Sequence, residues 1–280
     1  MQENPAAALL RALSTRFGED FDIPLGTVPL DDLACIASHA THRLYSDRPL
    51  DPALLRLICA CALSAPSKSD LQQCDLLIVR DPELRKKIAT LIPDQAHIAK
   101  APAFLVVLAN GRRLKQIAQL RGKPFVNDHL DQFFNAAVDA GIVLGNFLRA
   151  AAAAGLGCCP ISVIRDHAGV VSDLLKLPER VIPVAGLCVG WPAEQGHVTA
   201  RLPLDVTLHT DRFHDSNVAE EIDGYDRRRD KLFPYRTQRD PTRFGKAEFY
   251  GWSEDKARQY GVPQRADFGS FVRAKGFNLE

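Results

Sequence analysis

The sequence predicts a single domain that combines helices with a few buried strands and carries a C-terminal extension. Three short apolar runs, Asp75–Val79, Ala103–Leu108 and Val184–Val189, have the length of buried strands. They alternate with segments in which apolar residues recur at helical spacing. Residues 128–156 are apolar on most faces and rich in Ala and Gly, so we expect a helix buried centrally or in a subunit interface.

Local patterns justify each element in turn. Asp51 followed by Pro52 is typical of a helix N-terminus, and Gly155 or Gly157 should end the long helix. Pro192 ends the last apolar run because proline cannot donate to a ladder. The expected helices lie at residues 6–17, 31–38, 51–64, 81–92, 128–156, 168–177 and 267–276, and the expected strands at residues 75–79, 103–108, 158–164 and 181–189.

The composition is that of a soluble globular protein. A net charge of +1 over 280 residues argues against a nucleic-acid binder driven by bulk charge. The seven cysteines lie mostly in apolar runs, which predicts reduced, packed thiols in a cytoplasmic protein, and no Cys/His spacing fits a metal site. Because the first residues lack the pattern of a signal peptide and no apolar stretch is long enough to span a bilayer, we expect no membrane association.

The C-terminal part of the chain changes in character. Residues 224–266 are rich in Arg, Asp, Tyr and Pro and show little periodicity, so we expect an extended arm rather than an independent core. Interleaved acidic residues favour a solvated face or a partner contact over nucleic-acid binding, although an adaptor acting through residues 225–243 stays an alternative.

Three segments carry polar groups suited to a flavin nucleotide. In the first, residues 39–50, His39, Thr41 and Arg43 alternate, so an extended backbone would point them one way, as a phosphate site requires. The alternative is a polar loop that starts a helix. A single Arg in the loop after the last strand, Arg201, would suit an anionic group as well.

The second segment, residues 63–73, breaks a helix at Pro66 and offers hydroxyls, backbone N–H groups and one cation; the alternative is a helix-stop turn. In the third, residues 155–167, a glycine-ended helix precedes a strand-like run whose backbone could face the reactive end of a flavin. Hydride transfer to a flavin needs no acid or base from the protein. The hydrolase, P-loop and Rossmann motifs GxSxG, HExxH, GxxxxGKS/T and GxGxxG are missing.

These segments, in this order, resemble the nitroreductase family of FMN-dependent oxidoreductases, and in particular its larger oxygen-insensitive nitroreductase and flavin reductase branch. The resemblance runs from about residue 37 to 213. Its most specific pieces are residues 64–72, 94–101, 139–154 and 187–209. It implies an α+β fold with a central mixed or antiparallel sheet flanked by helices, and an intertwined homodimer that holds two FMN molecules at its interface.

The resemblance also implies the site residues, none of which is a catalytic side chain because the flavin carries the chemistry. Those expected to line the FMN phosphate and ribityl chain are His39, Thr41, Arg43 and Arg201. Those expected beside the flavin are Ser67, Lys68 and Ser69, contributed across the dimer, and Gln95. The backbone expected beside the reactive nitrogen of the ring is that of Pro160, Ile161, Ser162 and Val163.

The sequence departs from the family pattern at three places. Ala40 replaces an Arg of the early motif, Thr199 replaces a Lys of the late motif, and Ser162–Val163 replaces a Gly-Gly pair. Two cations expected near the phosphate are therefore missing, which predicts compensation elsewhere, weaker FMN binding or a narrower substrate pocket. The candidate compensating residues are His42, Lys68 and His197.

The implied function is reduction of nitroaromatic, quinone or flavin acceptors by NADH or NADPH through bound FMN, in a ping-pong cycle. The alternatives are a specialised flavoenzyme acting on one metabolite and a flavin-binding protein without turnover. We expect an N-terminal extension at 1–36, an FMN-binding domain at 37–215 and an arm at 216–280 that wraps the dimer. The physiological acceptor, the preferred nicotinamide and the role of the cysteines stay open.

Overall fold

The structure, a computed structural model, describes residues 4–27 and 29–280. The chain forms two compact units. The first combines Met1–Ala40 with His197–Gln264, and the second combines Thr41–Gly196 with Arg265–Glu280. Each unit is therefore built from segments that lie far apart in the sequence. The predicted domain boundaries after residues 36 and 215 stay a prediction.

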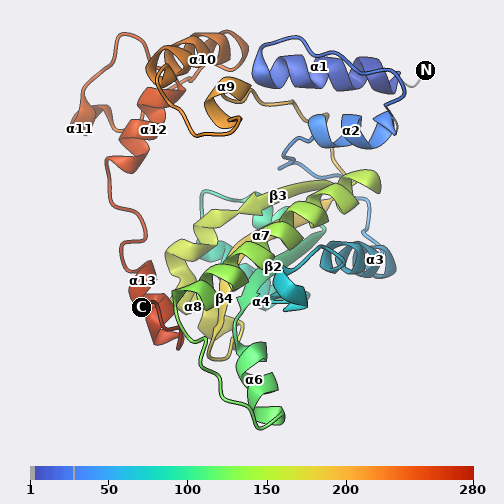
Figure 1. The fold of residues 1–280 in the computed structure, drawn as a ribbon, viewed down its shortest axis with the longest axis vertical. Helices are drawn as coiled ribbons and strands as arrows, with labels where there is room; N and C mark the ends of the chain where they lie inside the picture. Colours follow the sequence, from blue (N-terminus) through green and yellow to red (C-terminus); the bar gives the residue numbers. More distant parts are fainter. Residues whose placement is uncertain (1–3, 28) are drawn as a thin grey trace. The chain divides into compact units, whose positions relative to one another are not determined.

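A four-stranded sheet forms the centre of the second unit (Figure 1). Its strands are β1 (Cys74–Ile78), β2 (Ala103–Asn110), β3 (Gly157–Ile161) and β4 (Val181–Gly190). They lie in the order β1-β2-β4-β3, and every neighbouring pair is antiparallel. All eight residues of β2 are buried, as its unbroken apolar run predicts. The α+β class and the antiparallel sheet are thus confirmed.

Pro183 lies inside β4 although proline has no N–H for the ladder. Because β3 pairs only with Gly186–Gly190, the described sheet gives β4 no neighbour except β2 at this point. The register between β2 and β4 shifts between Val107 and Leu108, and Leu108 lies opposite Pro183. An irregularity of this kind lets a strand accommodate a proline.

Helices pack on both faces of the sheet (Figure 1). The helices of the second unit are α3 (Pro52–Leu63), α4 (Pro82–Thr90), α5 (His97–Lys100), α6 (Arg112–Leu120), α7 (Leu130–Ala153), α8 (Ala168–Leu174) and α13 (Phe268–Ala274). Successive residues of β2 point to opposite faces. Leu105 and Val107 belong to the core cluster that includes α3 and α7, whereas Phe104 and Val106 belong to the one that includes α4 and α8.

The prediction of a strand over residues 158–164 is wrong for residues 162–164. β3 ends at Ile161, and a 3₁₀ helix, η2 (Ser162–His167), follows. β3 pairs with β4 only as far as Gly186, and the Val184 carbonyl accepts a 2.5 Å hydrogen bond from the guanidinium of Arg165 in η2 instead. The side chain thus takes the place of a strand partner, which apolar patterning alone does not reveal.

The central helix α7 is apolar on two sides. Ala136, Ala140 and Phe147 are buried against the core, whereas Phe134 and Val138 on another side are exposed. By length and composition α7 is the one helix of the described residues that could cross a membrane, but a core helix passes the same test. It packs on β1, β2 and α3, so the predicted central position is confirmed for its buried side.

The first unit is helical. Its helices are α1 (Pro5–Phe17), α2 (Leu30–Ala37), α9 (Leu204–Thr207), α10 (Val218–Leu232), α11 (Pro241–Phe244) and α12 (Trp252–Tyr260). The expectation of an extended arm over 224–266 is therefore wrong in its local structure. Polar contacts replace an apolar stripe here: buried Asp226 accepts a 3.0 Å bond from the Ser253 N–H, and buried Arg258 donates to the carbonyls of Arg239 and Gly245.

Candidate functional site

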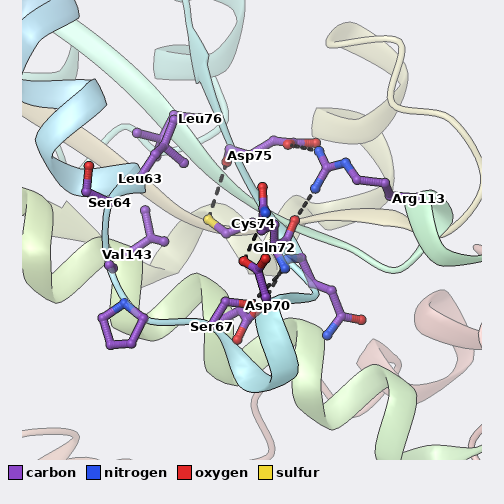
Figure 2. A pocket seen from close by; sticks show the side chains of 14 residues that line it. Leu63, Ser64, Ser67, Asp70, Gln72, Cys74, Asp75, Leu76, Arg113 and Val143 are labelled. Carbon is purple, nitrogen blue, oxygen red and sulfur yellow. Dashed lines mark hydrogen bonds and ion pairs between the residues drawn. The ribbon is translucent and has the colours of Figure 1, made fainter. Parts of the chain in front are cut away.

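A cavity of about 740 Å³ opens in the second unit between the end of α3, β1 and α7 (Figure 2). The predicted segment 63–73 forms one of its walls, and its lining includes Ser67, Cys74 and Asp139. A neighbouring cavity of about 350 Å³ is lined by Lys68 and the residues that precede α7. The structure thus places the second predicted segment at two adjoining hollows.

The Asp139 carboxylate holds this segment in place. It accepts hydrogen bonds from the Ser67 hydroxyl at 2.7 Å, the Gln73 N–H at 3.0 Å and the Lys68 N–H at 3.3 Å. Asp139 is 2 % exposed, so these bonds replace its hydration. The Ser67 hydroxyl in turn accepts from the Gln72 N–H at 2.7 Å. The Ser67 hydroxyl therefore stabilises the fold of this segment, and Asp139 anchors the segment to α7.

The backbone after Ser67 is strained. Ser69, Asp70 and Gln72 all have positive φ angles, of 49°, 59° and 52°, in the region that residues other than glycine rarely adopt. Such conformations cost of the order of 1 kcal/mol each and gather at ligand-binding sites. The Lys68 ammonium lies 3.4 Å from Asp131 in an exposed pair that contributes little to stability. Three predicted residues, Ser67, Lys68 and Ser69, therefore lie on one strained turn beside the cavity.

The segment that begins the second unit runs along β3. Thr41 forms a parallel bridge with Cys158, and the His42 N–H donates to the Cys158 carbonyl at 2.9 Å. Burial raises the pKa of the Cys159 thiol, and the neighbouring Arg43 guanidinium opposes this shift. The structure thus brings Thr41 and Arg43 to the strand that leads into Pro160–Val163.

Gln95 lies in the turn before α5, where its carbonyl accepts a 2.9 Å bond from the Ile98 N–H. Two residues later, burial lowers the pKa of His97, and Arg43 lowers it further. The Nε2 atom of His97 is buried without a hydrogen-bond partner among the described residues. Arg43 therefore neighbours both His97 and the Cys159 thiol, and of these three residues the sequence predicts only Arg43.

Two further predicted residues, His39 and Arg201, belong to the first unit. Buried Arg16 links their segments: its guanidinium donates to the carbonyls of His39 at 2.6 Å and Thr199 at 3.2 Å. The exposed Arg201 donates to the Thr199 hydroxyl at 2.6 Å. Burial lowers the pKa of Arg16, and the neighbouring charge of Arg201 lowers it further. Two guanidinium groups thus lie close together beside the His39 backbone.

The sequence did not single out Arg16, Asp139 or His97, which the structure places against the predicted residues His39, Ser67 and Arg43. A lone carboxylate in the apolar run of α7 could have indicated a buried acceptor, because such a group needs hydrogen-bond donors. No comparable pattern marks Arg16, whose partners are backbone carbonyls about 20 and 180 residues away.

Two family profiles match the chain. The nitroreductase family matches residues 36–191, and the C-terminal domain of the nitroreductase family matches residues 200–280. The first profile covers more than half of the chain, and the fold agrees with it. This chain belongs to the nitroreductase family, which confirms the resemblance seen in the sequence.

Individual relatives agree with this assignment. A Bacillus subtilis (strain 168) protein named FMN reductase, NAD(P)H, is 31% identical over 248 residues, which are 88% of this chain and 97% of the relative. The oxygen-insensitive NADPH nitroreductase of Salmonella typhimurium (strain LT2) is 35% identical over 188 residues, 66% of this chain and 75% of the relative. The solved structure of B. megaterium NfrA2 has a TM-score of 0.80 at 32% identity and covers 89% of this chain and 98% of its own.

Proposed function

We propose that the protein is an NAD(P)H-dependent FMN oxidoreductase that reduces small acceptors such as nitroaromatics, quinones or flavins in a ping-pong cycle. The names of the relatives support both FMN and the nicotinamide co-substrate. The observation in this structure that carries the proposal is the pair Arg16 and Arg201. Among the described residues, neither guanidinium has a carboxylate within ion-pair distance.

The residues of this chain fit the phosphate of FMN. Arg201 is exposed, and its Nη1 alone donates to the Thr199 hydroxyl and the Ala200 carbonyl, so the donors of Nε and Nη2 stay available within the described part of the chain. Arg16 adds positive charge that nothing in the described part of the chain neutralises. Guanidinium groups are the side chains that suit phosphate by charge and by geometry. An anion at this place would offset the repulsion between the two groups.

When bound, FMN supplies the two-electron redox chemistry, so the residues of the chain need only bind and orient it. We assign the phosphate and ribityl contacts to His39, Thr41, Arg43 and Arg201. We assign the contacts beside the flavin to Ser67, Lys68 and Ser69 of the partner protomer and to Gln95. We assign the backbone beside the ring to Pro160, Ile161, Ser162 and Val163. No side chain is assigned a catalytic role.

We further infer a homodimer. Phe134, Val138 and Ile142 recur at helical spacing on α7 and are all exposed, while Leu57 and Leu63 of α3 are exposed as well. The described residues Gly141 and Gly145 of α7 have open space where a Cβ would lie, so a second helix could approach closely there. An exposed apolar face of this kind is typical of a protein interface. A second copy of this chain supplies a matching face through two-fold symmetry.

The C-terminal arm, residues 216–280, is proposed to stabilise the dimer. Its end packs into the second unit: Val272 and Phe277 are buried, and Arg180 donates to the Gly276 carbonyl at 2.6 Å. A truncation after residue 215 should lower the thermal midpoint or dissociate the protomers. An intact, flavin-loaded dimer after truncation would contradict this part of the proposal.

The function is tested by a steady-state assay of the purified protein with NADH and NADPH against a panel of nitro, quinone and flavin acceptors. Turnover of several acceptors with parallel double-reciprocal lines supports the proposal. Turnover of a single metabolite would identify the specialised flavoenzyme instead. Bound flavin without any turnover would identify a flavin-binding protein.

A further inference from the structure

Arg16 lies on a helix that precedes the part of the chain matched by the family. The two family profiles begin at residues 36 and 200, so α1 lies outside both of them. α1 packs on α2 through a small core of Leu9, Ala12, Ala34 and Ala37. Arg16, in the last turn of α1, is 7 % exposed although it carries a charge. A charged side chain is seldom buried to this degree unless its donors are used.

Each of the three guanidinium nitrogens of Arg16 donates to a backbone carbonyl, and the carbonyls belong to two separate segments. Its Nε donates to the Ala37 carbonyl and its Nη2 to the His39 carbonyl, both at 2.6 Å, while Nη1 donates to the Thr199 carbonyl at 3.2 Å. The carbonyl of Arg16 itself accepts from the Arg201 N–H at 2.6 Å. Residue 16 is therefore hydrogen-bonded to both segments from which anion ligands are assigned in the first unit.

This arrangement also concentrates positive charge. Arg228 donates to the carbonyls of Arg16 at 3.1 Å and Arg201 at 2.6 Å, so a third guanidinium lies in the same place. In the described residues, no carboxylate is within ion-pair distance of Arg16, Arg201 or Arg228. Desolvated positive charge without a counter-ion is costly, and a bound anion relieves that cost.

The position of Arg16 coincides with the two departures from the family pattern. One of its carbonyl partners belongs to His39, directly before Ala40, and another belongs to Thr199. These are the places at which the sequence lacks an expected cation. Arg16 is therefore a further candidate, beside His42, Lys68 and His197, for the residue that compensates for the two missing cations.

We propose that Arg16 is a positioning residue for the phosphate end of the cofactor. It holds the His39 and Arg201 segments in place relative to each other, and it supplies positive charge that Ala40 and Thr199 do not. The inference rests on the proposed function, because it concerns the same FMN site. Arg16 is assigned no contact with the ligand, since it is buried and each of its three nitrogens already donates to a carbonyl, and it acts through Arg201 and through its buried charge.

The test compares FMN with riboflavin, which lacks the phosphate. Flavin-depleted full-length protein is titrated with each ligand, and quenching of the flavin fluorescence gives the two affinities. In Arg16→Met, FMN affinity should fall about tenfold to a hundredfold, as expected for loss of one charge-assisted contribution, whereas riboflavin affinity should stay unchanged. Equal loss for both ligands, or no loss for either, would overturn the proposal.

Two further variants keep the test decisive if Arg16→Met does not fold. Arg16→Lys keeps the charge, whereas Arg16→Gln keeps an amide donor group without the charge. The ratio of FMN to riboflavin affinity should be higher in Arg16→Lys than in Arg16→Gln, and equal ratios would overturn the proposal. Thr199→Lys introduced into the Gln variant should restore the ratio, and a failure to restore it would contradict compensation at this position.

Arg258→Met is the matched control, because Arg258 is another buried Arg of the first unit that donates to backbone carbonyls. It should lower the thermal midpoint and leave the FMN to riboflavin ratio as in the unaltered protein; a comparable fall in that ratio would show that the readout reports stability and would overturn the proposal. A failure of the proposed function looks different: the unaltered protein would then bind neither flavin.

Discussion

The hydroxyl of Ser67 and the carboxylate of Asp139 lie 2.7 Å apart, joined by a hydrogen bond that spans 72 residues of sequence. The same carboxylate accepts the N–H groups of Lys68 and Gln73. A strained turn with three positive φ angles is thus held on the central helix by one buried side chain. The shape of the cavity wall depends on this residue.

Replacement of Asp139 by Ala should destabilise the protein and release the turn at residues 67–73. Three donors lose their acceptor, the Gln73 N–H in a buried place and those of Ser67 and Lys68 in partly buried ones, which predicts a loss of about 2–4 kcal/mol in the free energy of unfolding. Urea denaturation measures the loss, and hydrogen exchange should accelerate at residues 67–73. Asp131→Ala, an exposed change in the same helix, should cost less than about 1 kcal/mol. A similar cost for both variants would contradict this account.

The buried guanidinium of Arg180 should be the costliest side chain to remove from the second unit. It binds Asp128 at 2.6 Å, Gln132 at 2.8 Å and the Gly276 carbonyl at 2.6 Å. Arg180→Met leaves these acceptors unpaired, so we expect a loss of about 3–5 kcal/mol in urea denaturation. Lys115→Met removes an exposed pair with a 3.8 Å separation and should change stability by less than about 1 kcal/mol. A loss of less than about 1 kcal/mol for Arg180→Met would contradict a stabilising role for these contacts.

Stability should fall as the pH rises above about 9. Burial raises the pKa of the Cys74 and Cys158 thiols to about 12 from an ordinary value of 9.0. Between these values the unfolded thiols lose their protons and the folded ones keep them, so the unfolded state binds fewer protons and its free energy falls relative to that of the folded state as the pH rises. Each thiol adds a slope of about 1.4 kcal/mol per pH unit at most.

Urea midpoints between pH 7.5 and 10.5 measure this slope. Cys158→Ala should flatten the pH dependence, whereas Cys61→Ala, at an exposed thiol, should leave it as it was. A pH dependence that does not change in Cys158→Ala would count against a raised pKa at this thiol.

The exposed face of α7 should mediate dimerisation. Phe134 is 60 % exposed in the single chain, and Phe134→Glu would place a charge in the inferred interface. We expect monomers by light scattering on a sizing column and a loss of bound flavin, because ligands from the partner protomer would be lost. Leu120→Glu on α6 changes a side chain that is more exposed than Phe134, and this control should leave the dimer intact. Monomeric unaltered protein would refute the inferred dimer.

Arg201 should bind the phosphate directly. Arg201→Ala removes a charge-assisted contact, and we expect FMN affinity to fall about tenfold to a hundredfold in a fluorescence titration. Arg43→Ala should weaken FMN as well. His39→Ala should have a smaller effect, because an imidazole offers fewer hydrogen-bond donors than a guanidinium. An unchanged FMN affinity in both Arg201→Ala and Arg43→Ala would contradict the assignment of these residues to the phosphate.

The sequence predicted the sheet well because its strands are apolar runs of the right length. β2 and β4 were found nearly to the residue, since strands buried on both faces show continuous apolarity. The same method failed at Ser162, where the partner of the Val184 carbonyl is the Arg165 side chain rather than another strand. It failed again over 224–266, where the helices depend on buried polar contacts such as that of Asp226 with Ser253.

The sequence names candidate positions such as Thr41 and Ser67 because they match a family pattern, and their roles stay predictions. The residues that hold those positions could not be read from the sequence: Arg16 binds carbonyls of residues remote in the chain, and nothing in the pattern of α1 distinguishes it from a surface Arg. Long-range contacts to the backbone leave no periodicity and no motif.

The most direct test of the central claim is an anaerobic titration of the purified full-length protein with NADH and with NADPH, followed by its flavin absorbance. The account predicts FMN in every protomer, bleaching of the flavin bands by at least one of the two nicotinamides, and recovery of the bands when a quinone or nitro acceptor is added. A colourless protein that cannot be reconstituted with FMN, or bound flavin that neither nicotinamide reduces, would contradict it.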